Sequence, residues 1–174
     1  MALVEAFAVA AAALGGFLLL FYRDPERVPD GPGMVSPADG RVIVAEPGRI
    51  AVFLNLHDVH VNRAPLGGRV VRVRHTPGRF RPAFGATGEN ERNEIDLETP
   101  AGPVRVTQVA GFVARRIVCS VREGQRVARG ERIGRILLGS RTDVTVPPGF
   151  RVVVAEGQRV KGGRTVIAIE REGA

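Results

Sequence analysis

The chain has 174 residues, of which 44% are hydrophobic, and its formal net charge is +7 at pH 7. This length suits one compact domain with an appendage, and the apolar content is enough for a real core. Cys119 is the only cysteine, which excludes a disulfide framework and any multi-cysteine metal site, and we predict no metal site. Because Cys119 lies in an apolar run, we expect a buried structural thiol rather than a nucleophile.

The basic residues indicate the kind of partner. Lys161 is the only lysine among 25 basic residues, and the arginines are scattered along the chain. A basic surface suits either nucleic acid or an anionic membrane. Nucleic-acid-binding proteins usually add a basic stripe, stacking aromatics or a recognisable motif, but this chain has one Tyr and no Trp. We therefore predict an anionic membrane surface as partner, and no nucleic acid.

Residues 1–22 are predicted to form a hydrophobic helix that anchors the chain in a membrane. Positions 6–22 are uncharged and mostly apolar, which reaches the lower end of the spanning range of about 17 to 25 residues. Glu5 stands where a secretory signal would be basic, and no polar cleavage region follows. Arg23 and Arg27 come directly after the apolar run, so the positive-inside rule places the following domain in the cytoplasm. A buried core helix is the alternative, and a helix that dips into one leaflet is as compatible with this length as a spanning one.

The next segment, residues 23–38, reads as a linker because its four prolines and two glycines oppose helix formation. From residue 39 to residue 174, short runs rich in Val and Ile alternate with Gly and Pro turns, which predicts a β-rich catalytic domain. Its clearest strands are expected at residues 41–45, 50–54, 69–74, 103–107 and 144–147. The stretch 79–93 is predicted to be a long loop near the site or a long hairpin connection.

An internal repeat narrows the fold class. Residues 121–136 recur 33 positions later as residues 154–169, and both copies contain the run EGQRV. The repeat resembles the glycine- and valine-containing unit of barrel-sandwich hybrid folds. We therefore predict an all-β, barrel-sandwich-hybrid-like domain with an internal repeat, preceded by one N-terminal hydrophobic helix. A lipoyl or biotinyl carrier is excluded because no lysine lies in residues 111–120 or 139–148, and the same scarcity excludes pyridoxal-phosphate chemistry.

Four short motifs follow one another along the chain: residues 21–27 (FYRDPER), 36–40 (SPADG), 59–65 (VHVNRAP) and 135–141 (RILLGSR). Each is weak alone, since a Gly-Ser pair, for example, usually marks a turn. In this order they resemble phosphatidylserine decarboxylase, in the short, archaeal-type form of this pyruvoyl-dependent proenzyme family. The resemblance extends from about residue 21 to about residue 148.

The resemblance implies a self-cleaving lyase. The chain would break between Gly139 and Ser140 into a β chain, residues 1–139, and an α chain, residues 140–174, which remain together as a heterodimer. Ser140 would become a covalent pyruvoyl cofactor that forms a Schiff base with the amine of phosphatidylserine, so that CO2 leaves and phosphatidylethanolamine results. Residue chemistry by itself permits such a cleavage, because a glycine without Cβ lets the backbone twist and the serine hydroxyl approach.

The self-cleavage needs a base, and histidine is the usual one near neutral pH. His60 lies in the third motif and is the candidate, whereas His57 and His75 are expected to be structural or surface residues, with His57 as the alternative base. Longer bacterial members carry a second histidine three residues after the first, where this chain has Arg63, so the family's relay of aspartate, histidine and serine cannot be transferred whole.

Two further residues are candidates from the same motifs. Asp39 matches the family's aspartate, although a turn aspartate in Pro-Ala-Asp-Gly is an almost equally good reading. Arg63 is a weak candidate for binding the lipid phosphate or the serine carboxylate, because a guanidinium recognises oxyanions in bidentate fashion; a plain surface arginine is the alternative.

Two other functions remain open from the sequence. One is a pyruvoyl decarboxylase of a soluble amino acid, against which the anchor and the basic surface argue. The other is a non-catalytic hybrid-barrel membrane adaptor, which would need the domain on the opposite side of the membrane and no processing.

Overall fold

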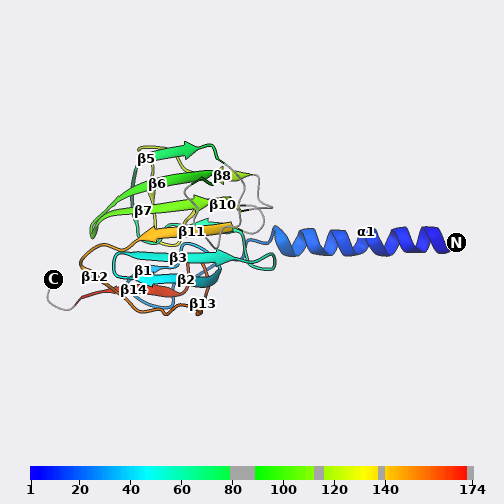
Figure 1. Ribbon diagram of the computed structural model, residues 1–174, viewed down its shortest axis with the longest axis horizontal. Helices are drawn as coiled ribbons and strands as arrows, with labels where there is room; N and C mark the ends of the chain where they lie inside the picture. The colour runs from blue at the N-terminus through cyan, green and yellow to red at the C-terminus, as the bar shows by residue number, and fades with distance from the viewer. Residues whose placement is uncertain (79–88, 112–115, 137–139, 172–174) are drawn as a thin grey trace.

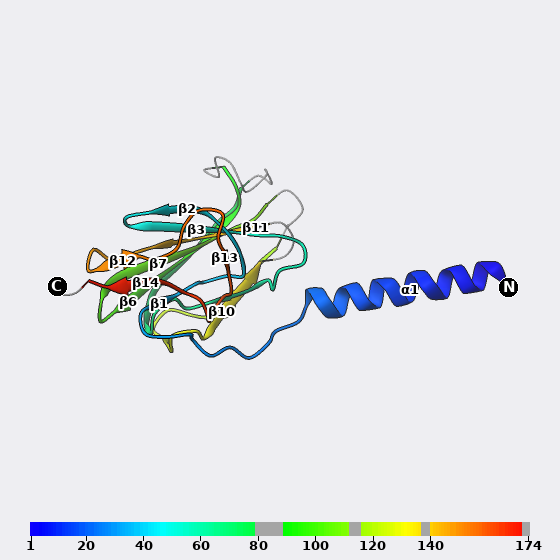
Figure 2. The same ribbon diagram turned by 90° about the horizontal axis from the view of Figure 1, so that it is seen from below.

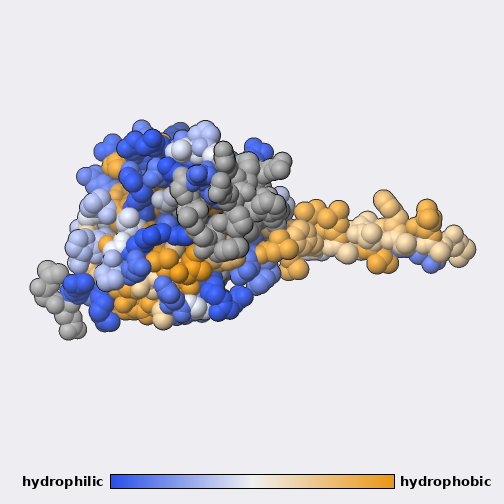
Figure 3. Space-filling model, in the orientation of Figure 1, coloured by the Kyte–Doolittle hydropathy of each residue, from blue (hydrophilic) through white to orange (hydrophobic). Residues whose placement is uncertain are grey.

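A computed structural model describes residues 1–78, 89–111, 116–136 and 140–171. The first element is helix α1 (Ala2–Phe21), which projects from a β-rich domain as an apolar rod (Figures 1 and 2). It is long and apolar enough to cross a membrane, and none of its most apolar 18-residue window is buried. Figure 3 shows this helix as an almost continuous hydrophobic surface attached to a domain with a largely hydrophilic face.

The described strands are all paired antiparallel and form three open sheets. The largest has the order β13-β2-β3-β11-β7-β6-β5-β9, and two three-stranded sheets have the orders β1-β14-β12 and β4-β10-β8. This confirms an all-β domain behind one apolar helix. The strands are β1 (Met34–Val35), β2 (Gly40–Glu46), β3 (Arg49–Leu54), β4 (Val61–Arg63), β5 (Gly68–Thr76), β6 (Arg92–Thr99), β7 (Gly102–Val109), β8 (Ile117–Cys119), β9 (Arg126–Val127), β10 (Arg132–Ile136), β11 (Ser140–Thr145), β12 (Phe150–Val152), β13 (Arg159–Val160) and β14 (Val166–Glu170).

The core lies on the inner face of the large sheet, where alternate residues of each strand point inward. Ile50, Val52 and Leu54 of β3 are fully buried, and Ile95 and Leu97 of β6 are buried in the same way. Burying a side chain of this size is worth about 1.5–3 kcal/mol, so the period-two pattern of these strands decides which face turns inward. Strand β11, which begins at Ser140, runs through the middle of this sheet between β3 and β7.

The two sequence repeats fold alike. In each copy a tight turn places the EGQRV glycine at positive φ, Gly124 at 85° and Gly157 at 84°, where a side chain would be strained. The N–H of Gly124 donates to the carbonyl of Val70, and the N–H of Gly157 donates to the carbonyl of Val42, both at 2.8 Å. The first copy thus docks on β5 and the second on β2, which confirms the repeat as a structural unit.

The predicted strands at 41–45, 50–54, 69–74 and 103–107 lie within β2, β3, β5 and β7, and the 144–147 segment contains the last two residues of β11. β6 was not predicted, and it pairs antiparallel with β5. Of the stretch 79–93, expected to be a long loop or a long hairpin connection, residues 79–88 lie outside the described part. β1 lies inside the segment expected to be linker, and its two side chains are fully buried.

Candidate functional site

Ser140 is the first residue of β11 and is completely buried. It pairs with Leu54 of β3, so the sheet fixes its backbone on that side. Within the described residues its hydroxyl has no hydrogen-bond partner, which is unusual because a buried hydroxyl left unpaired costs about 1–3 kcal/mol. Such a group in a folded protein calls for an explanation, and a chemical role is one of the known ones. Gly139, the expected residue on the other side of the cleaved bond, lies outside the described part of the chain.

His60 is another buried polar residue whose side chain lacks a partner among the described residues. It is 3% exposed, and neither ring nitrogen makes a hydrogen bond of ordinary geometry in the described structure. Its ring lies against Phe21, the last residue of α1, with centroids 4.3 Å apart. The carbonyl of His60 accepts the N–H of Ile136 at 3.1 Å, which places His60 beside the segment that leads into Ser140.

Burial lowers the pKa of His60, because the charged imidazolium would lose its hydration. The nearby carbonyl and carboxylate of Asp58 oppose this shift but do not outweigh it. A lowered pKa keeps the imidazole neutral at pH 7, which is the form that can accept a proton. His60 therefore has the protonation state that a base requires.

A chain of buried side chains joins the His60 segment to the Ser140 segment. Asn93 donates to Gln108 at 2.9 Å, Gln108 donates to Asn62 at 2.8 Å, and Asn62 donates to the hydroxyl of Thr142 at 2.9 Å. We call these four residues the amide ladder; each is at most 2% exposed. Asn62 lies two residues after His60 and Thr142 two residues after Ser140, so the ladder ties the two segments together.

The sequence analysis did not identify the amide ladder. The signal that could have revealed it is the alternation in β6, where Asn93 shares the inward face with Ile95 and Leu97. An asparagine in register with core residues needs a buried partner, but which side chain supplies it depends on the neighbouring strands.

Asp39 is buried at the start of β2, yet its hydrogen bonds lead elsewhere. One carboxylate oxygen accepts the N–H of Gly162 in the second repeat at 2.7 Å, and the other pairs with Arg27 at 3.0 Å. Burial raises the pKa of Asp39 and outweighs the opposing effects of Gly162 and Arg27. None of its hydrogen bonds in the described structure goes to His60 or Ser140.

Arg63 is 4% exposed, and its guanidinium is enclosed by the chain itself. It donates to the carbonyl of Gly130 at 3.0 Å, to the carboxylate of Asp24 at 3.0 Å and to the carbonyl of Pro25 at 2.8 Å. Arg132 binds the other oxygen of Asp24 at 2.6 Å. The arginine thus fastens the segment after α1 to the first repeat, and these contacts favour a structural role over the expected contact with substrate.

The other two histidines differ from His60 in being exposed. The side chains of His57 and His75 are 66% and 50% exposed, as expected for surface residues. Cys119 is half-buried, and its thiol lies 3.3 Å from the carbonyl of Val121. Among the residues that the structure describes, no three His, Cys, Asp or Glu side chains are grouped so as to hold a metal ion.

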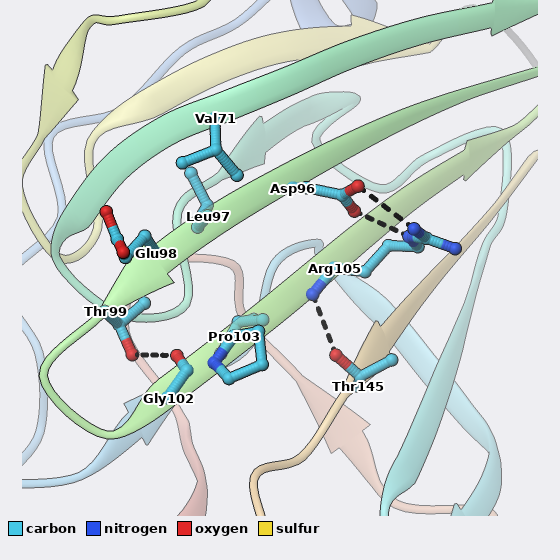
Figure 4. Close-up of a pocket in the computed structure, with 10 residues that line it drawn as sticks. Val71, Asp96, Leu97, Glu98, Thr99, Gly102, Pro103, Arg105 and Thr145 are labelled. Atoms are coloured by element: carbon cyan, nitrogen blue, oxygen red, sulfur yellow. Dashed lines mark hydrogen bonds and ion pairs between the residues drawn. The ribbon is translucent and has the colours of Figure 1, made fainter.

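A groove of about 790 Å³ lies at the end of β11 farthest from Ser140 (Figure 4). It is lined by β6 and β7. Arg105 there is paired with Asp96 at 2.6 Å, and its backbone N–H donates to Thr145 Oγ1 at 2.8 Å. Thr145 is the last residue of β11, whereas Ser140 is its first, which separates them by about 17 Å at ~3.3 Å per residue. This groove is therefore not the place where Ser140 would react.

Comparison with known proteins agrees with the motifs. The sequence model of one family, described as phosphatidylserine decarboxylase, matches residues 45–168. A phosphatidylserine decarboxylase proenzyme of Chlorobaculum tepidum is 45% identical, over 91% of this chain and 81% of the relative. Putative archaetidylserine decarboxylase proenzymes are similar as well: that of Methanosarcina barkeri is 45% identical over 91% of this chain and 79% of its own length, and that of Archaeoglobus fulgidus is 48% identical over 86% and 76%.

Proposed function

The chain belongs to the phosphatidylserine decarboxylase family, and on that premise we propose that it is a membrane-anchored, self-processing lyase that removes CO2 from the serine headgroup of phosphatidylserine. One observation supports this most directly. A buried serine hydroxyl and a buried neutral imidazole, both without partners in the described structure, lie on two segments joined by the amide ladder. This region adjoins the end of an apolar helix, where a lipid headgroup would be presented.

Self-processing would begin at Ser140. Its Oγ attacks the carbonyl carbon of Gly139 while a base, for which we propose His60, takes the hydroxyl proton; the C–N bond then breaks and an ester replaces the amide. Removal of the α-proton of residue 140 breaks the ester C–O bond and releases the carboxylate of Gly139. The remaining dehydroalanine tautomerises to an imine, and water converts it to the pyruvoyl group with loss of ammonia.

A pyruvoyl group at residue 140 supplies an electrophilic carbonyl that captures the substrate amine and accepts the electrons left by departing CO2. The chain's own residues would provide its surroundings. Burial of residue 140 excludes water, and a low-dielectric environment favours conversion of a localised carboxylate into dispersed charge. His60 can hold or return a proton there, and Asp39 remains a second candidate for proton transfer because its carboxyl is buried with a raised pKa.

The two products of cleavage would stay together as a heterodimer. The fragment 140–174 contains β11, which pairs with β3 on one side and β7 on the other, both in residues 1–139. β14 of the same fragment pairs with β1. Separating the fragments would expose the core that these strands bury, so one broken peptide bond does not release them.

We place the domain on the cytoplasmic face of the membrane. α1 has 20 residues and so is about 30 Å long at 1.5 Å per residue, close to the thickness of a bilayer core. Arg23 and Arg27 follow it directly, which supports this orientation by the positive-inside rule.

A direct assay tests the activity. Purified full-length protein in detergent micelles is given phosphatidylserine, free serine or free aspartate, and released CO2 is measured. Turnover of phosphatidylserine alone is expected. Turnover of only the free amino acid would replace the proposal by the soluble-substrate alternative, and no turnover together with an intact chain would favour the non-catalytic adaptor.

A further inference from the structure

A groove with two chemically different halves lies where α1 meets the domain. Its apolar half, about 410 Å³, is lined by Phe17, Leu20 and Phe21 of the helix and by Leu56 from the loop after β3. Leu20 and Leu56 are 63% and 50% exposed, although each is a large hydrophobic side chain. Because α1 has the length and composition to cross a bilayer, this half lies at the depth where lipid tails begin.

The polar half, about 480 Å³, continues from the same place. Arg23 and His57 line both halves, so the two are contiguous. Beyond them the polar half presents Arg159, Lys161 and Arg164, all from the second repeat. Three aspartates also line it, namely Asp30, Asp39 and Asp58.

Among the described residues, two of the four cations that line the polar half form no ion pair: Arg23, which instead donates to the carbonyls of Leu20 and His57, and Lys161. Arg164 is paired with Asp30 at 2.8 Å, and Arg159 lies 3.4 Å from Asp58. The ammonium of Lys161, the only lysine of the chain, makes no hydrogen bond or ion pair within the part of the chain that the structure describes. An ammonium is a compact point charge and a common binder of phosphate.

An apolar trough that runs into a cationic pocket matches one kind of molecule. We propose that this groove binds a glycerophospholipid, with its acyl chains along Phe17, Leu20 and Leu56 and its phosphate at Lys161. A free phosphate or a soluble phosphomonoester would use only the polar half. The inference rests on the proposed function, because it assigns to that activity the site through which the lipid reaches the enzyme.

Phe21 connects the groove to the reactive region. Its ring lines the apolar half on one side and contacts His60 on the other. Phe21 and Arg23 also border a small enclosed gap together with His60, Val61 and Arg135. A lipid seated in the groove would therefore have its headgroup near Arg23, one aromatic ring away from His60.

Two substitutions test the apolar and the polar half of the groove independently. Leu56→Gln removes apolar surface from the trough, and Lys161→Gln removes the ammonium; both side chains are exposed enough that the fold should tolerate the change. The matched controls are Val28→Gln, an 80% exposed apolar residue outside the groove, and Arg151→Gln, an exposed cation on β12. Full-length protein in phosphatidylcholine nanodiscs is assayed with dihexanoyl-phosphatidylserine and with glycerophosphoserine, which shares the headgroup but has no acyl chains.

The substrate pair decides the outcome. Leu56→Gln should raise KM for the diacyl substrate about 3- to 10-fold and leave glycerophosphoserine unchanged, because only the acyl chains use the trough. Lys161→Gln should raise KM for both about 5- to 10-fold with kcat nearly constant, because it removes binding shared by ground and transition states. If the wild type is active but Leu56→Gln and Lys161→Gln change KM no more than the control substitutions do, the proposed lipid-binding role of this groove is wrong and the proposed function still stands. A wild type inactive on every serine phosphodiester would overturn the proposed function with it.

Discussion

The ring of Phe21, the last residue of the apolar helix, lies 4.3 Å from the imidazole of His60, with the two planes inclined by 36°. The last residue of a segment with the length and composition of a membrane span thus packs against His60, the residue that we propose as the base. This contact makes Phe21 a buried residue of the domain, at 5% exposure, while its helix neighbours remain exposed. The contact therefore fixes the end of the apolar helix directly against His60.

Ser140→Ala should leave one intact, inactive polypeptide, because it removes the attacking oxygen. The wild type should separate on a denaturing gel into residues 1–139 and a fragment of 35 residues, and the two should copurify under native conditions. Intact-mass spectrometry should find the small fragment lighter than the serine peptide by one ammonia. Because its N-terminus would be a pyruvoyl group without an amine, the fragment should also resist Edman degradation. Active wild-type protein that consists of a single uncleaved chain would refute the pyruvoyl hypothesis.

His60→Ala should slow self-cleavage at least about 100-fold, the usual contribution of a positioned general base. Circular dichroism should show the fold retained, and His75→Ala, at an exposed position, should cleave at the wild-type rate. Normal cleavage of the His60 variant would transfer the role to His57 or Asp39.

The pH dependence of cleavage follows from the lowered pKa of His60. Because the pKa of His60 lies below the ordinary histidine value of 6.5, the pH at which the cleavage rate has fallen to half its plateau should lie below 6.5. Stability has the same sign: the unfolded state binds the proton more readily, so the free energy of unfolding decreases as pH drops below 6.5. A cleavage rate that halves at pH 6.5 or above would show that the titrating group is not this buried histidine.

Asp39→Asn should separate the two roles of this carboxylate. An asparagine side chain can still accept the N–H of Gly162, so its melting temperature should exceed that of Asp39→Ala. If the carboxylate takes part in proton transfer, the asparagine variant should fold but cleave at least about tenfold more slowly. Wild-type cleavage rates in the asparagine variant would leave Asp39 as a residue that holds the second repeat.

Arg63→Ala and Asp24→Asn should have coupled effects on stability. The two side chains form a largely buried ion pair, so a double-mutant cycle on the Ser140→Ala background should give a coupling free energy of about 1–3 kcal/mol by urea unfolding. Asp30→Asn combined with Arg63→Ala is the control, since Asp30 pairs with Arg164 instead. A substrate-binding Arg63 would behave differently: its loss would raise KM while Asp24→Asn left KM unchanged.

Gln108→Met should lower the free energy of unfolding by about 2–5 kcal/mol. The substitution leaves the side-chain oxygen of Asn62 and the side-chain NH2 of Asn93 buried without these partners. Gln125→Met, which changes a half-buried turn amide, should cost less than about 1 kcal/mol. Equal effects of the two substitutions in urea unfolding would show that the amide ladder contributes nothing beyond side-chain volume.

Much of the architecture could be predicted because it follows from local chemistry. The apolar run before Arg23, the β-branched runs and the glycines of the EGQRV repeat each report a local preference, and they led to the helix, to most of the central strands and to the repeat. β6 was missed because its inward residues begin with Asn93, which reads as a loop residue until Gln108 supplies its partner.

In the candidate site, too, some features could be predicted from local chemistry and others could not. The sequence by itself determined which residues are candidates: Ser140, which follows a glycine, and His60, which lies in a motif that resembles one of the family. Only the tertiary structure decided their surroundings, because burial, a lowered pKa and the contact with Phe21 arise from segments far apart in the chain. The same is true of Arg63, whose charge suggested a ligand until folding brought Asp24 and Gly130 to it. A side chain's chemistry is local, but the partners that satisfy it or leave it free are set by the packing of the whole chain.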